Sequence, residues 1–123
     1  MKTFTLLQLF SIVDGRLSTT MDDVYDILNT AFDTQFMTHH LPTAMDYLKL
    51  HKPDWFLKAE FKLFEIRSEI GTDEFTVLID EICRNYTKTE YEVDKLPDEV
   101  LKGFGSYLLE NSLLLKKFSY YEN

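Results

Sequence analysis

Three histidines and one cysteine are the side chains best suited to hold a transition metal: His39, His40, His51 and Cys83. Zinc sites in proteins use characteristic short spacings between such ligands. Adjacent His39 and His40 project in different directions on a helix, and the interval from His40 to His51 is not a diagnostic zinc spacing. We therefore expect no metal and no cofactor, with the histidines at the surface or in helix caps and Cys83 as a buried thiol.

A second group of chemically capable residues is Asp54, Glu60 and Lys62, which superficially matches the acidic pair and lysine of a restriction-type nuclease core. That chemistry needs the Glu and Lys at alternate positions of a strand, so that both reach one metal. This stretch instead has helical periodicity and follows Pro53, a residue typical of helix starts. No serine lies in a nucleophile elbow, and the chain has no GxGxxG or Walker motif. We expect no enzymatic activity.

Residues 73–99 are the most polarised part of the chain, with nine carboxylates against three basic side chains, an excess of six negative charges. Glu90, Glu92 and Asp94 alternate with Tyr91 and Val93, which predicts a short strand with carboxylates outward, one every ~6.6 to 6.8 Å. Such a row of anions could occupy a phosphate-binding groove. It could equally be a solvated edge strand that its charges protect from aggregation. The predicted partner-binding residues are Asp73, Glu74, Asp80, Glu81, Glu90, Glu92 and Asp94.

The chain as a whole is also acidic. Its 21 acidic and 13 basic side chains give a formal net charge of −8 and a pI near 4.8. Affinity for a phosphate backbone comes mainly from Lys and Arg, so we expect no direct binding to nucleic acid. A basic protein surface is the natural complement. The alternative is that the charge only keeps a small protein soluble.

Length and composition predict one domain, residues 1–123, with a real core, because 45% of the side chains are apolar and 15% aromatic. The longest apolar runs are far short of the ~20 residues that span a bilayer, and residues 1–13 lack the features of a signal peptide. A single cysteine agrees with a reducing compartment. We expect a cytoplasmic protein that does not enter a membrane.

Helical periodicity accounts for most of the chain. Its clearest instance is residues 21–31, where Thr20 and Asp23 form a capping-box-like pair and an apolar stripe that includes Leu28 follows. Proline starts and glycine stops place further helices at residues 41–50, 53–70, 72–86 and from 98 onward. Leu48 is expected on the buried face of the helix at residues 41–50.

Two segments are less regular. Residues 3–13 are apolar enough for a buried helix or a buried strand, and we favour a short helix. The strand predicted near residues 89–94 needs a partner, and none is obvious in the sequence. The fold class expected is mainly α: a compact single domain of five to six helices with one small β element near residues 89–94.

The helices at residues 21–31 and 41–50 also suggest an alternative function, a helix-turn-helix regulator. In that motif the start of the second helix contacts bases and phosphates. Here Lys49 and Lys52 come only at its end, and the preceding helix is acidic where it would cross the DNA backbone. A DNA-binding regulator is therefore the second hypothesis, and a small enzyme the third.

The N-terminal segments LFSIVDGRLS, DVYDILN and THHLPTAMDYL resemble sequences from a family of small uncharacterised bacteriophage and prophage proteins. The resemblance covers about residues 9–56 and, more loosely, the acidic GTDEFTVLIDEI segment. It implies a phage accessory protein that works in the bacterial cytoplasm. The resemblance assigns no role to any individual residue, and the segments around Asp14 and His40 look like joints that fix the fold.

Phage proteins of this kind often bind host or defence proteins, and small acidic ones include inhibitors of CRISPR nucleases and DNA mimics. The leading hypothesis is accordingly an inhibitor that docks an acidic surface onto a basic groove of a bacterial nucleic-acid-handling protein. A CRISPR nuclease is the foremost single target. This hypothesis leaves the oligomeric state open.

Overall fold

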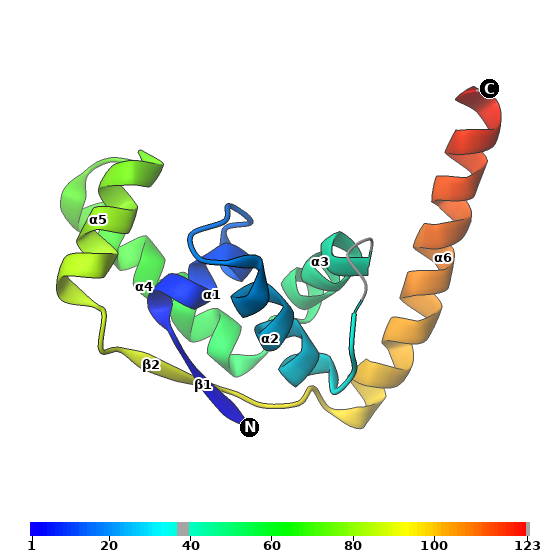
Figure 1. The fold of residues 1–123 in the computed structure, drawn as a ribbon, viewed down its shortest axis with the longest axis horizontal. Coiled ribbons are helices and arrows are strands. Elements are labelled where there is room, and N and C mark those ends of the chain that lie inside the picture. Colours follow the sequence, from blue (N-terminus) through cyan, green and yellow to red (C-terminus); the bar gives the residue numbers. More distant parts are fainter. Residues whose placement is uncertain (37–39, 123) are drawn as a thin grey trace.

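The computed structural model describes residues 1–36 and 40–122, with side chains through residue 110. Six helices and two short strands make up this part of the chain (Figure 1), which confirms the predicted mainly helical fold with one small β element. The elements are β1 (Lys2–Thr5), α1 (Leu6–Val13), α2 (Met21–Phe32), α3 (Leu41–His51), α4 (Asp54–Ile70), α5 (Phe75–Asn85), β2 (Glu90–Val93) and α6 (Asp98–Glu122).

The two strands pair with each other, although β1 begins at residue 2 and β2 only at residue 90. They run antiparallel, with Lys2 opposite Val93 and Thr5 opposite Glu90. The prediction of a helix over residues 3–13 is therefore wrong for its first three residues, which belong to β1. The helix begins only after Thr5, whose hydroxyl accepts from the backbone N–H of Gln8 while the Gln8 side chain accepts from the N–H of Thr5. This reciprocal capping box sets the boundary.

Helix α1 lies at the centre of the core. Its side chains at Leu6, Leu9 and Phe10 have no exposed surface, and α1 contacts α2, α4 and α5. Because the helix is covered on several sides, its sequence is almost continuously apolar and shows no clear amphipathic stripe. The surrounding helices complete the core with further fully buried side chains, among them Ile27, Leu28, Leu48, Phe56, Ile66, Leu78 and Ile82.

Helices α2 and α3 have the predicted bounds to within one residue. Thr20 caps α2 by accepting from the N–H of Asp23, and Asp33 ends the helix in the left-handed conformation at φ 52°. Pro42 lies in the first turn of α3, where its missing N–H costs nothing. Leu28 on α2 and Leu48 on α3 are fully buried, as their positions on the apolar stripes predicted.

Helix α4 ends at Ile70, as predicted, and the residue that caps it, Gly71, adopts φ +65°. Helix α5 then begins at Phe75, three residues later than predicted. The hydroxyl of Thr72 accepts from the backbone N–H of Glu74, and the extended Glu74 is the N-cap residue. This local turn delays the first helical residue, so Asp73 and Glu74 precede α5 instead of lying in its first turn.

Helix α6 starts beside α3 and its ribbon then runs away from the other elements (Figure 1). Helical spacing in the sequence predicts one apolar face of α6 through Leu101, Phe104, Leu108 and Leu115. Phe104 is buried against Phe32 and Tyr47, and Leu101 and Leu108 are partly buried. Leu115, the fourth member of that face, lies outside the described side chains. None of the helices, over the residues described, is long and apolar enough to cross a membrane.

Candidate functional site

Strand β2 presents carboxylates to solvent, as predicted from its alternating pattern. Glu90 and Glu92 are exposed on the strand and Asp94 is exposed just after it. Val93 is fully buried and Tyr91 partly buried on the other face. Because Thr5 and Thr3 lie opposite Glu90 and Glu92 on β1, the outward face of the sheet is polar throughout.

A hollow of about 500 Å³ collects these carboxylates. Its lining includes Glu90 and Glu92 from β2, Asp94 just after it and, from the start of α4, Asp54 and Lys58. We call this set of four carboxylates and one lysine the acidic hollow. Four anionic groups against one cation leave an excess of three negative charges around one concave surface. Trp55 and Tyr91 supply the aromatic part of the same lining.

The other four predicted partner-binding residues lie elsewhere. Asp73 and Glu74 belong to the connection between α4 and α5, and the Asp73 carboxylate is 3.7 Å from Nε of Arg67. Asp80 and Glu81 are on α5, where Glu81 accepts a hydrogen bond from the side chain of Asn85. The acidic hollow therefore gathers three of the seven predicted residues and adds Asp54. No local pattern predicts this position for Asp54, because it lies 36 positions before Glu90 in the sequence and comes near β2 only through the fold.

Tyr91 separates the acidic hollow from a second surface. Burial raises the pKa of the Tyr91 phenol, and the positive charge of Lys62 partly opposes this rise. The Lys62 ammonium donates to Glu65 at 3.0 Å and lies 5.7 Å from the centre of the Tyr86 ring. The phenol of Tyr91 therefore stays protonated at neutral pH and can donate a hydrogen bond.

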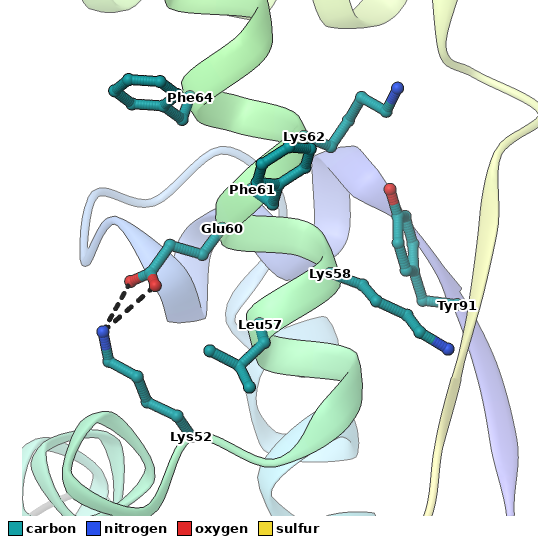
Figure 2. Close-up of a pocket in the computed structure, with 8 residues that line it drawn as sticks. All are labelled: Lys52, Leu57, Lys58, Glu60, Phe61, Lys62, Phe64 and Tyr91. Atoms are coloured by element: carbon teal, nitrogen blue, oxygen red, sulfur yellow. Dashed lines mark hydrogen bonds and ion pairs between the residues drawn. The ribbon is translucent and has the colours of Figure 1, made fainter.

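The second surface is the outer face of α4, shown in Figure 2, and the sequence analysis missed it. Leu57, Phe61 and Phe64 have exposed fractions of 45%, 63% and 66%. We call these three residues the outer strip. Together with Lys52, Lys58, Glu60, Lys62 and Tyr91 they line an open hollow of about 890 Å³. A second apolar stripe at positions 57, 61 and 64, on the face opposite the buried stripe that includes Phe56 and Leu63, was the available signal.

Metal ligation finds no support in the described residues, among which no group of three or more His, Cys, Asp or Glu side chains could hold an ion. His39 lies outside the described residues, and His51 contacts the ring of Tyr47. Cys83 is exposed on α5, so the expectation of a buried thiol was wrong. The apolar face of α5 is instead occupied by Leu78 and Ile82, and Cys83 falls beside that face.

The two alternative interpretations can be compared with the geometry. Glu60 and Lys62 lie on α4, a helix, as their periodicity predicted, and not at alternate positions of a strand. Helices α2 and α3 are joined by residues 33–40, a connection longer than the turn of three to four residues in a helix-turn-helix. No observation on the described residues favours either alternative over protein binding.

Comparisons with known proteins identify a similarity over the first part of the chain. Residues 4–61, just under half of the length, match a family model described as a domain of unknown function (DUF7736). The matched region runs from β1 to Phe61 on α4, and it includes Asp54 and two residues of the outer strip but not β2. No curated protein and no solved structure matches the chain.

Proposed function

We propose that this protein is a non-enzymatic binding protein that docks the acidic hollow onto a basic surface of another protein. The observation that carries this proposal is the convergence of Glu90, Glu92, Asp94 and Asp54 around one concave surface with a single lysine. Carboxylates from two separate elements face the same space. An arginine or lysine side chain of a partner would find several acceptors there at once.

The chemistry of the hollow selects a cationic partner group. A guanidinium can form paired hydrogen bonds with one carboxylate, and such charge-assisted bonds are about twice as strong as neutral ones. The protonated phenol of Tyr91 adds a donor at the edge. A nucleic acid is the opposite case, because its phosphates would meet the carboxylates of a chain whose formal net charge is −8.

The biological role we propose is inhibition of a bacterial nucleic-acid-handling or defence protein by occupation of its basic groove, with a CRISPR nuclease as the foremost target. The row of carboxylates along β2 would lie where the groove normally holds phosphates. The resemblance of the N-terminal segments to phage proteins supports a phage origin for this inhibitor. The bacterial cytoplasm is the compartment in which such an inhibitor works.

The experiment starts with capture of partners from phage-infected host lysate on the immobilised protein, followed by binding kinetics with the captured protein. The variant Glu90→Gln, Glu92→Gln, Asp94→Asn removes three charges from exposed positions, so the fold should persist. We expect its affinity to fall by about tenfold or more, mainly through slower association, and the wild-type association rate to fall as salt rises.

A matched control removes three other exposed charges: Asp46→Asn, Glu99→Gln and Glu110→Gln. Asp23 and Asp26 are unsuitable for this purpose, since they hold Gln8 and Lys2. The control should bind like the wild type apart from a small general effect of net charge. Equal binding of the β2 variant and the wild type, at low and at physiological salt, would exclude the acidic hollow as the docking surface.

A further inference from the structure

The outer strip of α4 gives this helix two apolar faces. One face is buried through Phe56, Ala59 and Leu63, while the opposite face exposes Leu57, Phe61 and Phe64. Large exposed apolar side chains are common singly, but a contiguous row on one helix marks an interaction surface. The intervals of four and then three residues are those of the apolar seam through which two helices pack in a coiled coil.

Charged residues border the outer strip on both sides. Lys58 and Lys62 project from the side of α4 on which Tyr91 lies, while Lys52 reaches Glu60 at 3.1 Å on the other side (Figure 2). Lys58 and Glu65 are seven positions apart, two helical turns, so they lie on the same edge of the strip. Within one chain, Lys58 lies 3.8 Å from Asp54 and Glu65 lies 3.0 Å from Lys62. The Lys58 and Glu65 side chains are nevertheless 69% and 42% exposed, which leaves both able to make further contacts.

These charges have a symmetry that a second copy of α4 would match. Lys58 lies three residues before Phe61 and Glu65 lies four residues after it. If two copies of α4 pack antiparallel with Phe61 at the centre, a two-fold axis through the interface relates them. The edge of one helix that carries Lys58 and Glu65 then lies against the same edge of the other helix. Lys58 of each copy then comes beside Glu65 of the other, with an offset of about 1.5 Å along the axis. Near the axis, each Glu60 already has Lys52 of its own chain as a partner.

We infer that the protein forms a two-fold symmetric dimer through antiparallel packing of the outer strips, with Lys58 and Glu65 paired between the copies. Two copies bury six large apolar side chains and form two equivalent ion pairs, the self-complementary arrangement that a two-fold interface requires. A partner with a uniformly acidic or uniformly basic helix would match only half of this edge. This inference does not rest on the proposed function, because the carboxylates Glu90, Glu92 and Asp94 lie outside the outer strip. Lys58 borders both surfaces.

The test is the mass of the full chain by analytical ultracentrifugation over a range of concentrations. We expect a dimer for the wild type. Phe61→Glu should shift the protein to the monomer, since it places two like charges on the axis. Leu109→Glu, at an equally exposed apolar position on α6, is the matched control and should remain dimeric. Circular dichroism melts check that each variant is folded.

Charge reversal tests the antiparallel arrangement itself. Lys58→Glu alone, and Glu65→Lys alone, each create two repulsive contacts and should weaken the dimer by about tenfold or more. An equimolar mixture of these two variants should recover the dimer, because each ion pair in the mixed dimer again joins opposite charges. The double variant should recover it as well.

Each remaining outcome overturns the inference. A wild type that is monomeric at all concentrations means that no second copy covers the outer strip. A dimer that persists with Phe61→Glu uses another surface. A dimer that Phe61→Glu disrupts, but that the two charge reversals leave unchanged, is not packed antiparallel with Lys58 beside Glu65.

Discussion

Arg67 on α4 donates a hydrogen bond from Nη2 to Oδ1 of Asp14 at 2.6 Å, and so ties the joint after α1 to a residue 53 positions away. The other carboxylate oxygen of Asp14 accepts from Nε of Arg16. The Arg16 guanidinium also lies 4.8 Å from the centre of the Phe75 ring at the start of α5. One carboxylate therefore links α1, α4 and the first residue of α5.

This arrangement predicts how stability depends on pH. Burial alone would raise the pKa of Asp14, but hydrogen bonds and charges from Arg16 and Arg67 outweigh burial and hold it below its usual value. A group with a lowered pKa in the folded state stabilises the fold above its unfolded pKa, about 3.9, and loses this contribution as pH falls through the folded value. Asp14→Asn should therefore destabilise the protein at pH 7, with a difference from the wild type that shrinks below about pH 4.

Urea unfolding at a series of pH values measures this difference. Asp73→Asn is the control, because Asp73 is 91% exposed and lies 3.7 Å from the Nε of Arg67, beyond hydrogen-bond distance. It should change the free energy of unfolding little at any pH. If the difference between Asp14→Asn and the wild type stays constant down to pH 2, the carboxylate charge is not what stabilises the joint.

A second prediction concerns the core. Leu28 and Leu48 have no exposed surface, so Leu28→Ala or Leu48→Ala should each lower the free energy of unfolding by roughly 2 to 5 kcal/mol. Leu50→Ala is the comparison on the same helix as Leu48, because Leu50 is 67% exposed, and it should change stability by only about 0.5 kcal/mol. Thermal melts of the three variants are sufficient. An unchanged melting temperature for either core variant would contradict the packing of α2 and α3.

Much of the helical structure could be predicted because its signals are local. Thr20, Pro42 and Gly71 mark helix boundaries through hydrogen bonds or backbone angles within a few residues of themselves. The alternation of Glu90, Tyr91, Glu92 and Val93 similarly predicted which side chains of β2 point outward. Such patterns depend little on the rest of the chain.

The parts that could not be predicted depend on distant residues. Lys2 pairs with Val93, and neither segment contains a turn or a repeat that would reveal this pairing, so the sequence pattern favours a helix for residues 3–5 of β1. The position of Asp54 beside the carboxylates of β2 likewise depends on the fold, and no local pattern reveals it. The outer strip is different, because its spacing was visible in the sequence. The buried stripe of α4 is sufficient to predict the helix, so this second stripe adds nothing to the prediction of secondary structure.

The third prediction concerns metal removal. Since the described residues offer no group of three or more ligands, chelation by EDTA should leave the melting temperature and the circular dichroism spectrum unchanged. A structural zinc site would behave differently, because its binding free energy is part of the folding free energy. Elemental analysis that found one zinc per chain, together with unfolding in chelator, would contradict this prediction.

The last prediction uses the two glycines of α6, which have opposite surroundings. A Cβ at Gly103 would lie 2.7 Å from the hydroxyl oxygen of Tyr47, whereas a Cβ at Gly105 would meet nothing within 4 Å. The Tyr47 hydroxyl cannot easily move away, because it donates to the carbonyl oxygen of Val100 at 2.6 Å and the ring is buried. Gly105→Ala should therefore stabilise the protein by about 0.5 to 1 kcal/mol through helix propensity.

Gly103→Ala should instead destabilise it, by about 1 to 3 kcal/mol, because overpacking outweighs the same propensity gain. Tyr47→Phe removes the oxygen that clashes and leaves the nearest ring carbon at 4.0 Å, an ordinary contact distance. In that background Gly103→Ala should become stabilising, so the sign of its effect should reverse. Urea unfolding of the wild type, the two single variants and the double variant measures this coupling. If Gly103→Ala has the same effect with Tyr47 and with Phe at that position, the close approach of the Tyr47 hydroxyl to α6 is not the reason for a glycine at position 103.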